Sequence, residues 1–384
     1  MSEIFHHSFN TLSHGLIGYA VPFLFVLTIV VFFHELGHFL VARWAGVKVL
    51  TFSLGFGPEL VGFNDRHGTR WKVSAVPLGG YVRFVGDDSD ASTPSAEALA
   101  NLTEEERAGS FHHKKVGPRS AIVAAGPIAN FVLAVVIFTG LFTFIGKPST
   151  TARVDKVEAN SPAAAAGFRD GDIVLSIDGS KIDSFTDMQE IVSTHPGEKM
   201  SFTVKRGDGT VTLHGTPQLR EMKDPFGNVH RQGVLGITRQ TAPGEVLTER
   251  VDPVTALGLA VKQTWFVIDR TLSYIGGVFT GREAADQVGG PLRIAQISGQ
   301  VASMGGWAGL IQLAAILSIS IGLLNLFPIP LLDGGHLLFY AVEAVRGRPL
   351  SERAQEMGFR IGLGLVLMLM VFATYNDILH LAAS

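Results

Sequence analysis

Two histidines and a glutamate with helical spacing are the residues of this sequence most able to do chemistry. They form the motif His34-Glu35-Leu36-Gly37-His38. In a helix, residues i and i+4 share one face, so the imidazoles of His34 and His38 can bind one metal ion. Glu35 lies beside them and can take a proton from a metal-bound water. Zinc with two imidazole ligands and one carboxylate ligand keeps a fourth position for that water and lowers its pKa to roughly 7.

The surroundings of this motif favour a metal site over a chance match. Phe, Val, Ile and Leu flank the motif on both sides, whereas a chance match usually lies on a solvated helix. An ionisable side chain in an apolar helix of membrane length costs at least about 2.5–3.5 kcal/mol by insertion scales. Three such groups within five residues need a compensating partner, and a divalent cation can supply it.

A third ligand has to come from a distant part of the chain. Asp333 is the first choice, because it places a carboxylate at membrane depth in the segment Asn325-Leu326-Phe327-Pro328-Ile329-Pro330-Leu331-Leu332-Asp333-Gly334-Gly335. Asp-Gly-Gly also suits a simple turn, and His336 is a competing ligand that we rank lower. Only the fold can bring Asp333 to the histidines.

The composition indicates a membrane protein. Of 384 residues, 47% are hydrophobic and only 17% are charged, against about 25% charged in a soluble domain. The net charge of −3 gives no electrostatic basis for binding nucleic acid. The chain has no cysteine, which excludes disulfides, thiolate ligands and a cysteine nucleophile. The first 15 residues lack Lys and Arg, so we expect no removable signal peptide.

Four apolar segments are long enough to cross a bilayer, for which about 20 residues suffice. They cover about 16–45, 120–145, 309–327 and 357–375. The first contains the HExxH motif near its end, and prolines break or kink the third at its end. Asn130 in the second is expected to bond to a neighbouring helix, with lining of a site as the secondary interpretation. The sequence therefore predicts a multi-pass α-helical membrane protein with four transmembrane helices.

Basic residues are distributed unevenly around these segments. Ten Lys and Arg lie between the first two spans, from 43 to 119, and four lie from 341 to 360, whereas neither end of the chain has any. By the positive-inside rule, both basic stretches are cytoplasmic and both termini lie outside. The HExxH motif and Asp333 then both fall near the cytoplasmic face, which supports their meeting.

Residues 47–84, between the first two spans, are typical of β-strands. Asn64-Asp65 and His67-Gly68 predict turns between the strands. We therefore expect a β-hairpin region directly after the helix that carries HExxH. Two interpretations stay open. One is a small soluble sheet, and the other is a hairpin beside the site whose edge strand binds a substrate in extended form.

Residues 150–218 predict a soluble α+β domain. A strand at 152–157 precedes a short helix at 161–167, and a second helix is expected at 184–194. This order and the pattern SPAxxAG…GDxxLSIDG resemble a circularly permuted PDZ domain, whose peptide groove would lie between 152–157 and 184–194. A spacer or size filter that binds no peptide is the alternative.

Residues 254–279 carry Lys262, Asp269 and Arg270 within an apolar sequence whose large side chains follow one helical stripe. We expect an amphipathic helix on the membrane surface. Residues 281–306 are rich in glycine, and Gly289-Gly290-Pro291 is expected to redirect the chain.

These motifs together resemble the site-2 protease family of intramembrane zinc metalloproteases. The resemblance covers nearly the whole chain: HELGH at 34–38, the β segment ending PLGGYV, GPIAN in the second span, the PDZ-like domain, GGPLRIA at 289–295 and NLFPIPLLDGGH at 325–336. It implies a Zn²⁺ cofactor bound by His34, His38 and Asp333. It also implies that Glu35 is the catalytic base and that Asn325 binds substrate.

The resemblance further implies a re-entrant hairpin at about 47–84 and a place in the bacterial inner membrane, with the PDZ domain periplasmic. The expected substrates are transmembrane segments of single-pass membrane proteins, chiefly anti-sigma factors and also remnant signal peptides. The chain departs from well-known relatives by having one PDZ domain instead of two. The expected domains are the first two transmembrane helices with HExxH and the hairpin, the PDZ domain, a linker with the amphipathic helix, and the last two transmembrane helices, at 1–146, 147–220, 221–306 and 307–384.

Two other classes of function are consistent with the same residues. One is a non-catalytic membrane PDZ adaptor with a structural metal. The other is a metal transporter, since buried His and Asp also line ion pathways. The single fixed HExxH motif favours hydrolysis.

Overall fold

The computed structural model describes residues 2–86, 102–149, 151–223, 229–239, 247–281 and 289–383. The chain forms two compact units. Of the described residues, those up to 138, from 257 to 271 and from 289 onward belong to unit 1, and the others belong to unit 2. Unit 1 holds the HExxH motif and Asp333, and unit 2 holds the predicted α+β domain.

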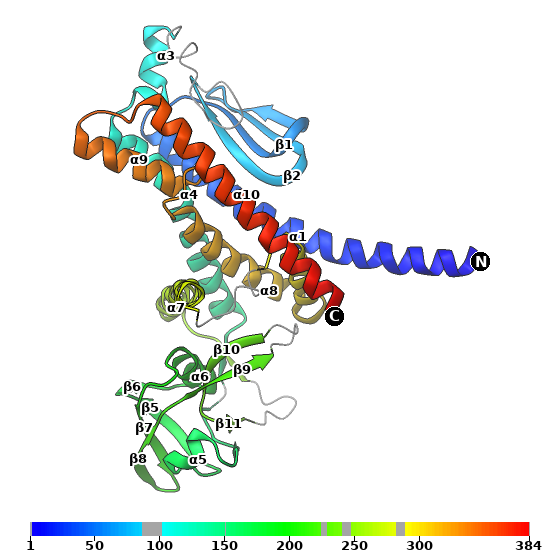
Figure 1. Ribbon diagram of the computed structural model, residues 1–384, viewed down its shortest axis with the longest axis vertical. Helices are drawn as coiled ribbons and strands as arrows, with labels where there is room; N and C mark the ends of the chain where they lie inside the picture. The colour runs from blue at the N-terminus through cyan, green and yellow to red at the C-terminus, as the bar shows by residue number, and fades with distance from the viewer. Residues whose placement is uncertain are drawn as a thin grey trace. The chain divides into compact units, whose positions relative to one another are not determined.

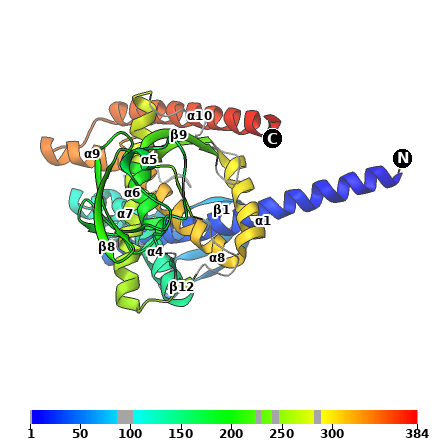
Figure 2. The same cartoon turned by 90° about the horizontal axis from the view of Figure 1, so that it is seen from below.

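Among the described residues, four helices are long and apolar enough to cross a membrane. They are α1 (Ser2–Trp44), α4 (Val116–Phe144), α8 (Pro291–Asn325) and α10 (Glu352–Ala383). The amino-terminal part of α1 projects from unit 1 in both views (Figure 1 and Figure 2). Large apolar side chains are exposed along α10, as expected of a helix that faces lipid. The predicted set of four apolar helices is confirmed.

The third of these helices is longer than the sequence suggested. α8 begins at Pro291, whereas we expected the span to start near residue 309 after a glycine-rich connection. Gly306 interrupts the helix with φ 55° and ψ −146°, a conformation that glycine adopts at little cost. The glycines of this region lower helix propensity, and they hid the part of α8 that precedes the break.

A carboxylate from another helix caps the first turn of α8. Gly290 at the N-cap has no side chain, and Asp377 of α10 accepts hydrogen bonds from the backbone N–H groups of Gly290, Leu292 and Arg293 at 2.8, 3.1 and 3.1 Å. Asp377 is only 2% exposed. It satisfies N–H groups that a helix start leaves without partners, and its charge faces the positive end of the helix dipole.

The two strands that follow α1 form a bent antiparallel hairpin (Figure 1). They are β1 (Val49–Asn64) and β2 (Arg70–Phe84). Residues 49–54 pair with 80–84 on one side and with 70–73 on the other, and residues 59–64 pair with 70–74. The outer edges of this sheet are therefore residues 59–64 and 80–84.

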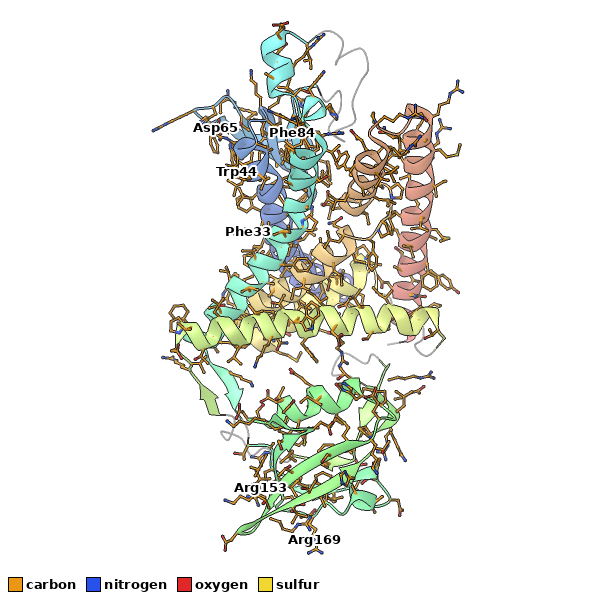
Figure 3. All side chains as sticks on the ribbon, turned by 90° about the vertical axis from the view of Figure 1, so that its left-hand side faces the viewer. Phe33, Trp44, Asp65, Phe84, Arg153 and Arg169 are labelled. Carbon is orange, nitrogen blue, oxygen red and sulfur yellow. The ribbon has the colours of Figure 1, made fainter. Side chains whose placement is uncertain are left out.

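The predicted turn between β1 and β2 is confirmed. Oδ1 of Asp65 accepts hydrogen bonds from the backbone N–H groups of His67 and Thr69 at 2.8 and 2.9 Å. Gly68 has φ 83°, which favours glycine. Oδ2 of Asp65 accepts from Nη1 of Arg43 at 3.0 Å. This ion pair ties the turn to the end of α1, where Figure 3 labels Trp44 and Asp65.

Three short helices of unit 1 were not expected. They are α3 (Glu104–Gly109), the 3-10 helix η1 (Phe111–His113) and α9 (Asp333–Arg346). The first lies between the hairpin and α4, and Thr103 with Glu106 forms a capping box at its start. The third changes the setting of Asp333, which starts a helix instead of lying in a simple turn.

Unit 2 confirms the two helices that the sequence predicted. Its helices are α5 (Pro162–Ala166) and α6 (Phe185–Thr194), and Ser161 and Ser184 cap them. A four-stranded sheet has the order β6-β5-β7-β8, formed by Ser180–Lys181, Ile173–Ile177, Met200–Arg206 and Gly209–Gly215. The remaining strands are β3 (Lys147–Ser149), β4 (Lys156–Val157), β9 (Gln218–Lys223), β10 (Val229–Val234), β11 (Ile237–Thr238) and β12 (Leu247–Glu249).

A strand beyond the predicted range of this domain, 150–218, lies beside α6. β4 pairs with β11, and α6 packs against β10. A side chain on Gly233 of β10 would overlap the backbone of Val192 in α6. Leu235 is buried in the same core as Phe202. Residues 229–234 thus lie next to α6, and the peptide groove between residues 152–157 and α6 stays a prediction.

The predicted amphipathic helix is confirmed as α7 (Pro253–Phe279). Asp252 caps it by accepting hydrogen bonds from the N–H groups of Val254 and Thr255 at 3.0 and 3.1 Å. Leu257 and Trp265, on the predicted apolar stripe, are exposed. The apolar stripe of α7 can therefore contact apolar surroundings.

Removing the carboxylate that caps α8 tests how much it stabilises unit 1. We expect Asp377→Ala to lower the free energy of unfolding by about 1–3 kcal/mol, because three backbone donors lose a charged acceptor. Asp377→Asn keeps one acceptor oxygen and should lose less. Thermal unfolding of the detergent-purified chain measures both, and equal stability of Asp377→Ala and wild type would contradict the assignment.

Candidate metal centre

The fold brings the two motif histidines and Asp333 together. Nε2 of His34 lies 3.2 Å from Nε2 of His38. Oδ2 of Asp333 lies 3.2 Å from Nε2 of His34 and 3.6 Å from Nε2 of His38. Among the described residues, these three side chains bring one ligand atom each to a common point, with all three atoms within 4.8 Å of one another.

These distances fit a tetrahedral zinc ion. Bonds of about 2.0–2.1 Å at tetrahedral angles put neighbouring ligand atoms about 3.3 Å apart. Oδ2 of Asp333 is buried, and among the described residues nothing donates a hydrogen bond to it, since its approach to His34 lacks hydrogen-bond geometry. A buried acceptor without a donor, next to two ring nitrogens, is the arrangement that a cation satisfies. The residues present therefore fit zinc.

Glycines allow α1 and α4 to approach closely beside this cluster. Gly37, within the HExxH motif, faces Ala125 and Ala129 of α4, and a Cβ there would overlap the backbone of Ala125. Gly126 of α4 faces the ring of His38, and a Cβ there would overlap that ring. Small residues at such contacts are typical of packed membrane helices.

Asp333 is held by the way in which α9 begins. Gly334 and Gly335 pack onto the backbone of residues 326–330, and a Cβ on either would overlap carbonyl oxygens there. Leu331, two residues before the carboxylate, has φ 105°, which is strained for a non-glycine residue. The Asp-Gly-Gly sequence is thus needed for close packing. The glycine pair also hid α9, since glycine disfavours a helix.

An ion pair ties α9 to the start of α4. Nη2 of Arg119 lies 2.5 Å from Oε1 of Glu343, and each side chain is 14% exposed. The guanidinium of Arg119 also lies 4.7 Å from the ring centre of Tyr340. These contacts fix α9 against α4, which itself packs on the helix of the two histidines.

A cavity of about 600 Å³ opens onto the cluster. Glu35 and Asn325, both predicted as site residues, line it together with the three candidate ligands. Gly80 of β2 comes so close that a Cβ there would lie 3.1 Å from Cγ of Glu35. The edge residues 80–82 of β2 line the same cavity. Glu35 thus lies between the cluster and a sheet edge.

His336, the competing third ligand, is not part of the converging group. Its ring packs against Phe359 and Tyr340 with centroid distances of 5.3 and 6.4 Å. Asn130 is the residue whose importance the sequence analysis underrated, since its side chain lies 3.2 Å from Nδ1 of His34. A signal was available, because Gly126 and Asn130 repeat the four-residue spacing of the two histidines.

Comparison with known proteins gives one consistent result. The profile of peptidase family M50 matches residues 22–369. A protein of Agrobacterium fabrum, named as a candidate zinc metalloprotease, is 50% identical over 363 residues, which cover 94% of this chain and 96% of the relative. A Rhizobium meliloti protein with the same kind of name is 50% identical over 361 residues, with the same coverage. Metalloprotease MmpA of Caulobacter vibrioides is 41% identical over 385 residues, which cover 95% of this chain and 96% of the relative.

A solved structure matches a smaller part of the chain. The PDZ domain of an SdrC-like protein from Listeria monocytogenes is 23% identical, and the match covers 22% of this chain and 83% of that domain. The TM-score is 0.18, which is too low to establish the fold of that segment.

The packing of the Asp-Gly-Gly segment can be tested by adding one methyl group. Gly334→Ala should push Asp333 away from the histidines and weaken zinc binding by about tenfold or more, as changes in the support of metal ligands do. Gly364→Ala in α10 is the matched control, because a Cβ there meets nothing within 4 Å. Zinc affinity from competition with a chelator measures both variants, and an unchanged affinity of Gly334→Ala would refute this account.

Proposed function

Because this chain belongs to peptidase family M50, we propose that His34, His38 and Asp333 hold its zinc ion. The family makes the chain an intramembrane zinc metalloprotease that acts on membrane proteins in a lipid environment. The adaptor and transporter alternatives are therefore set aside. The observation that carries the ligand assignment is the convergence of three ligand atoms, separated by 3.2–3.6 Å, from α1 and α9.

Glu35 is the proposed catalytic base. A zinc ion held by His34, His38 and Asp333 would polarise the substrate carbonyl and make water more acidic. Glu35 takes a proton from the attacking water while the water oxygen bonds to the carbonyl carbon. When the C–N bond breaks, the same carboxyl group gives the proton to the leaving amine. Glu35 lines the cavity beside the three ligands, where it can serve both steps.

The substrate has to be extended where it is cut. The amides of a transmembrane helix are already hydrogen-bonded, and its side chains cover them. Gly80 and Tyr81 of β2 pair on one side with β1, and at these residues we propose that the sheet edge accepts a further strand. Because residues 80–82 line the cavity, a substrate strand added there would pass Glu35. Asn325, at the end of α8, can hydrogen-bond to the substrate backbone from the same cavity.

The location of the hairpin supports contact with lipid. Leu60, Val61 and Phe63, on the outer edge of the sheet formed by residues 59–64, are 70, 64 and 62% exposed, which is costly in water and favourable in a bilayer. We assign the hairpin as re-entrant on this basis. The exposed apolar stripe of α7 supports a place on the membrane surface.

The remaining assignments follow from charge and resemblance. The basic residues at 43–119 and 341–360 support a metal site near the cytoplasmic face of the inner membrane and a PDZ-like domain in the periplasm. The inferred substrates are single-pass proteins of the anti-sigma factor type and remnant signal peptides. The proposed domain boundaries are 146, 220 and 306. Leu235, from the segment after residue 220, packs into the core of the PDZ-like domain.

Changing the base without changing the ligands tests the mechanism. Glu35→Gln should keep zinc and lower the cleavage rate by about a hundredfold to ten-thousandfold, because the amide cannot take the proton. The measurement is cleavage of a synthetic transmembrane peptide in detergent, together with the zinc content of the purified protein. Glu356→Gln, on the exposed face of α10, is the control and should cleave normally. Normal cleavage by Glu35→Gln would remove Glu35 from this role.

A further inference from the structure

The second apolar helix places its GPIAN motif directly beside the two histidines. The side chain of Asn130 contacts the ring of His34, and Gly126 faces the ring of His38. The two helices therefore run antiparallel here, with matching four-residue spacings. Nδ1 of His38 donates to the backbone carbonyl of Ile122 at 2.8 Å. Nδ1 of each imidazole thus faces α4, whereas Nε2 of each imidazole faces Asp333.

We propose that Asn130 is a positioning residue for the metal site, with its side-chain oxygen accepting the Nδ1–H of His34. The proposal rests on the assignment of His34 as a zinc ligand through Nε2. A neutral imidazole that binds a metal through one nitrogen carries its hydrogen on the other. That hydrogen needs an acceptor, and in metal sites such a partner fixes the tautomer and the orientation of the ring.

The chemistry of the amide agrees with this role. In the structure Nδ2 of Asn130 lies 3.2 Å from Nδ1 of His34, while Oδ1 is buried and has no hydrogen-bond partner among the described residues. A half-turn of the amide exchanges these two atoms. Of the two orientations, only the one with oxygen toward His34 pairs a donor with an acceptor when Nε2 binds the metal.

Asn130 is held firmly enough to position a ring. Its side chain is fully buried. The hydroxyl of Ser318 in α8 donates to the backbone carbonyl of Asn130 at 2.9 Å. Gly322, one turn further along α8, lets that helix come so close that a Cβ would lie 3.1 Å from Cβ of Asn130. Asn130 is thus fixed between α1 and α8, although it lies outside the ligand set.

The two histidines obtain equivalent support from different chemical groups. His38 uses a backbone carbonyl of α4 and needs no side chain there, which explains a glycine at 126. His34 lies one turn away, where the Asn130 side chain reaches it. A neutral amide supplies the acceptor without burying another charge next to Glu35 and Asp333.

Zinc affinity of the full chain tests the proposal independently of cleavage. Asn130→Leu keeps the size of the side chain but removes the acceptor, and it should weaken zinc binding by about 10–100-fold. Asn130→Asp keeps the acceptor and should bind zinc at least as tightly as wild type. Ser298→Ala is the control, since its hydroxyl is buried and bonds to Ile294 within its own helix. Competition with a chelator in detergent gives all the affinities.

Each result has a defined meaning. A leucine variant that binds zinc like wild type, an aspartate variant as weak as the leucine variant, or an equal loss in Ser298→Ala would overturn the proposal. If Asn130→Leu does not fold, Asn130→Ala gives the same comparison with Asn130→Asp. His38→Ala separates the two levels of the argument. Unchanged zinc binding in that variant would defeat the ligand assignment itself, whereas a loss there with none in Asn130→Leu would defeat only the role of Asn130.

Discussion

The cost of keeping two imidazoles and two carboxylates inside an apolar bundle is the constraint on which this structure depends. Such groups have to be paired, because the surroundings cannot solvate them. Asp333 comes from α9 to meet His34 and His38. Nδ1 of His38 donates to a backbone carbonyl of α4, and Nδ1 of His34 faces the side-chain amide of Asn130 on the same helix. The helix backbone thus satisfies His38, and the proposed zinc ion would satisfy the ring nitrogens and the carboxylate oxygen that converge.

These polar contacts form only where the backbones of neighbouring segments approach one another more closely than side chains normally allow. Gly37 and Gly126 bring α1 and α4 together, Gly322 brings α8 to Asn130, and Gly334 lets α9 begin against the preceding segment. In each place the missing Cβ leaves room for a carbonyl or a ring. These four glycines are therefore needed to build the candidate metal site, although none of them supplies a ligand atom.

The sequence predicted the features that depend on neighbouring residues or on a regular spacing of residue types. Helical spacing identified His34 and His38, and apolar length identified the four long helices. Turn residues identified the hairpin around Asp65 and Gly68. What the sequence did not reveal depends on contacts between distant segments. The glycines before Gly306 and after Asp333 hid two helical segments that tertiary packing stabilises. The contact of Asn130 with His34 could not be read from either helix alone.

The position of Asp333 has a consequence for how the chain is held together. His34 and His38 lie on α1, near the other end of the sequence, so the proposed ion would close a loop that contains most of the polypeptide. Closing a long loop removes much of the freedom of the unfolded chain. The proposed ion would then be a cross-link as well as a catalytic group, and the bundle would be incomplete until the last third of the polypeptide has been inserted. A nascent or truncated chain that lacks α9 would hold the two histidines without the capacity to cut its neighbours in the membrane.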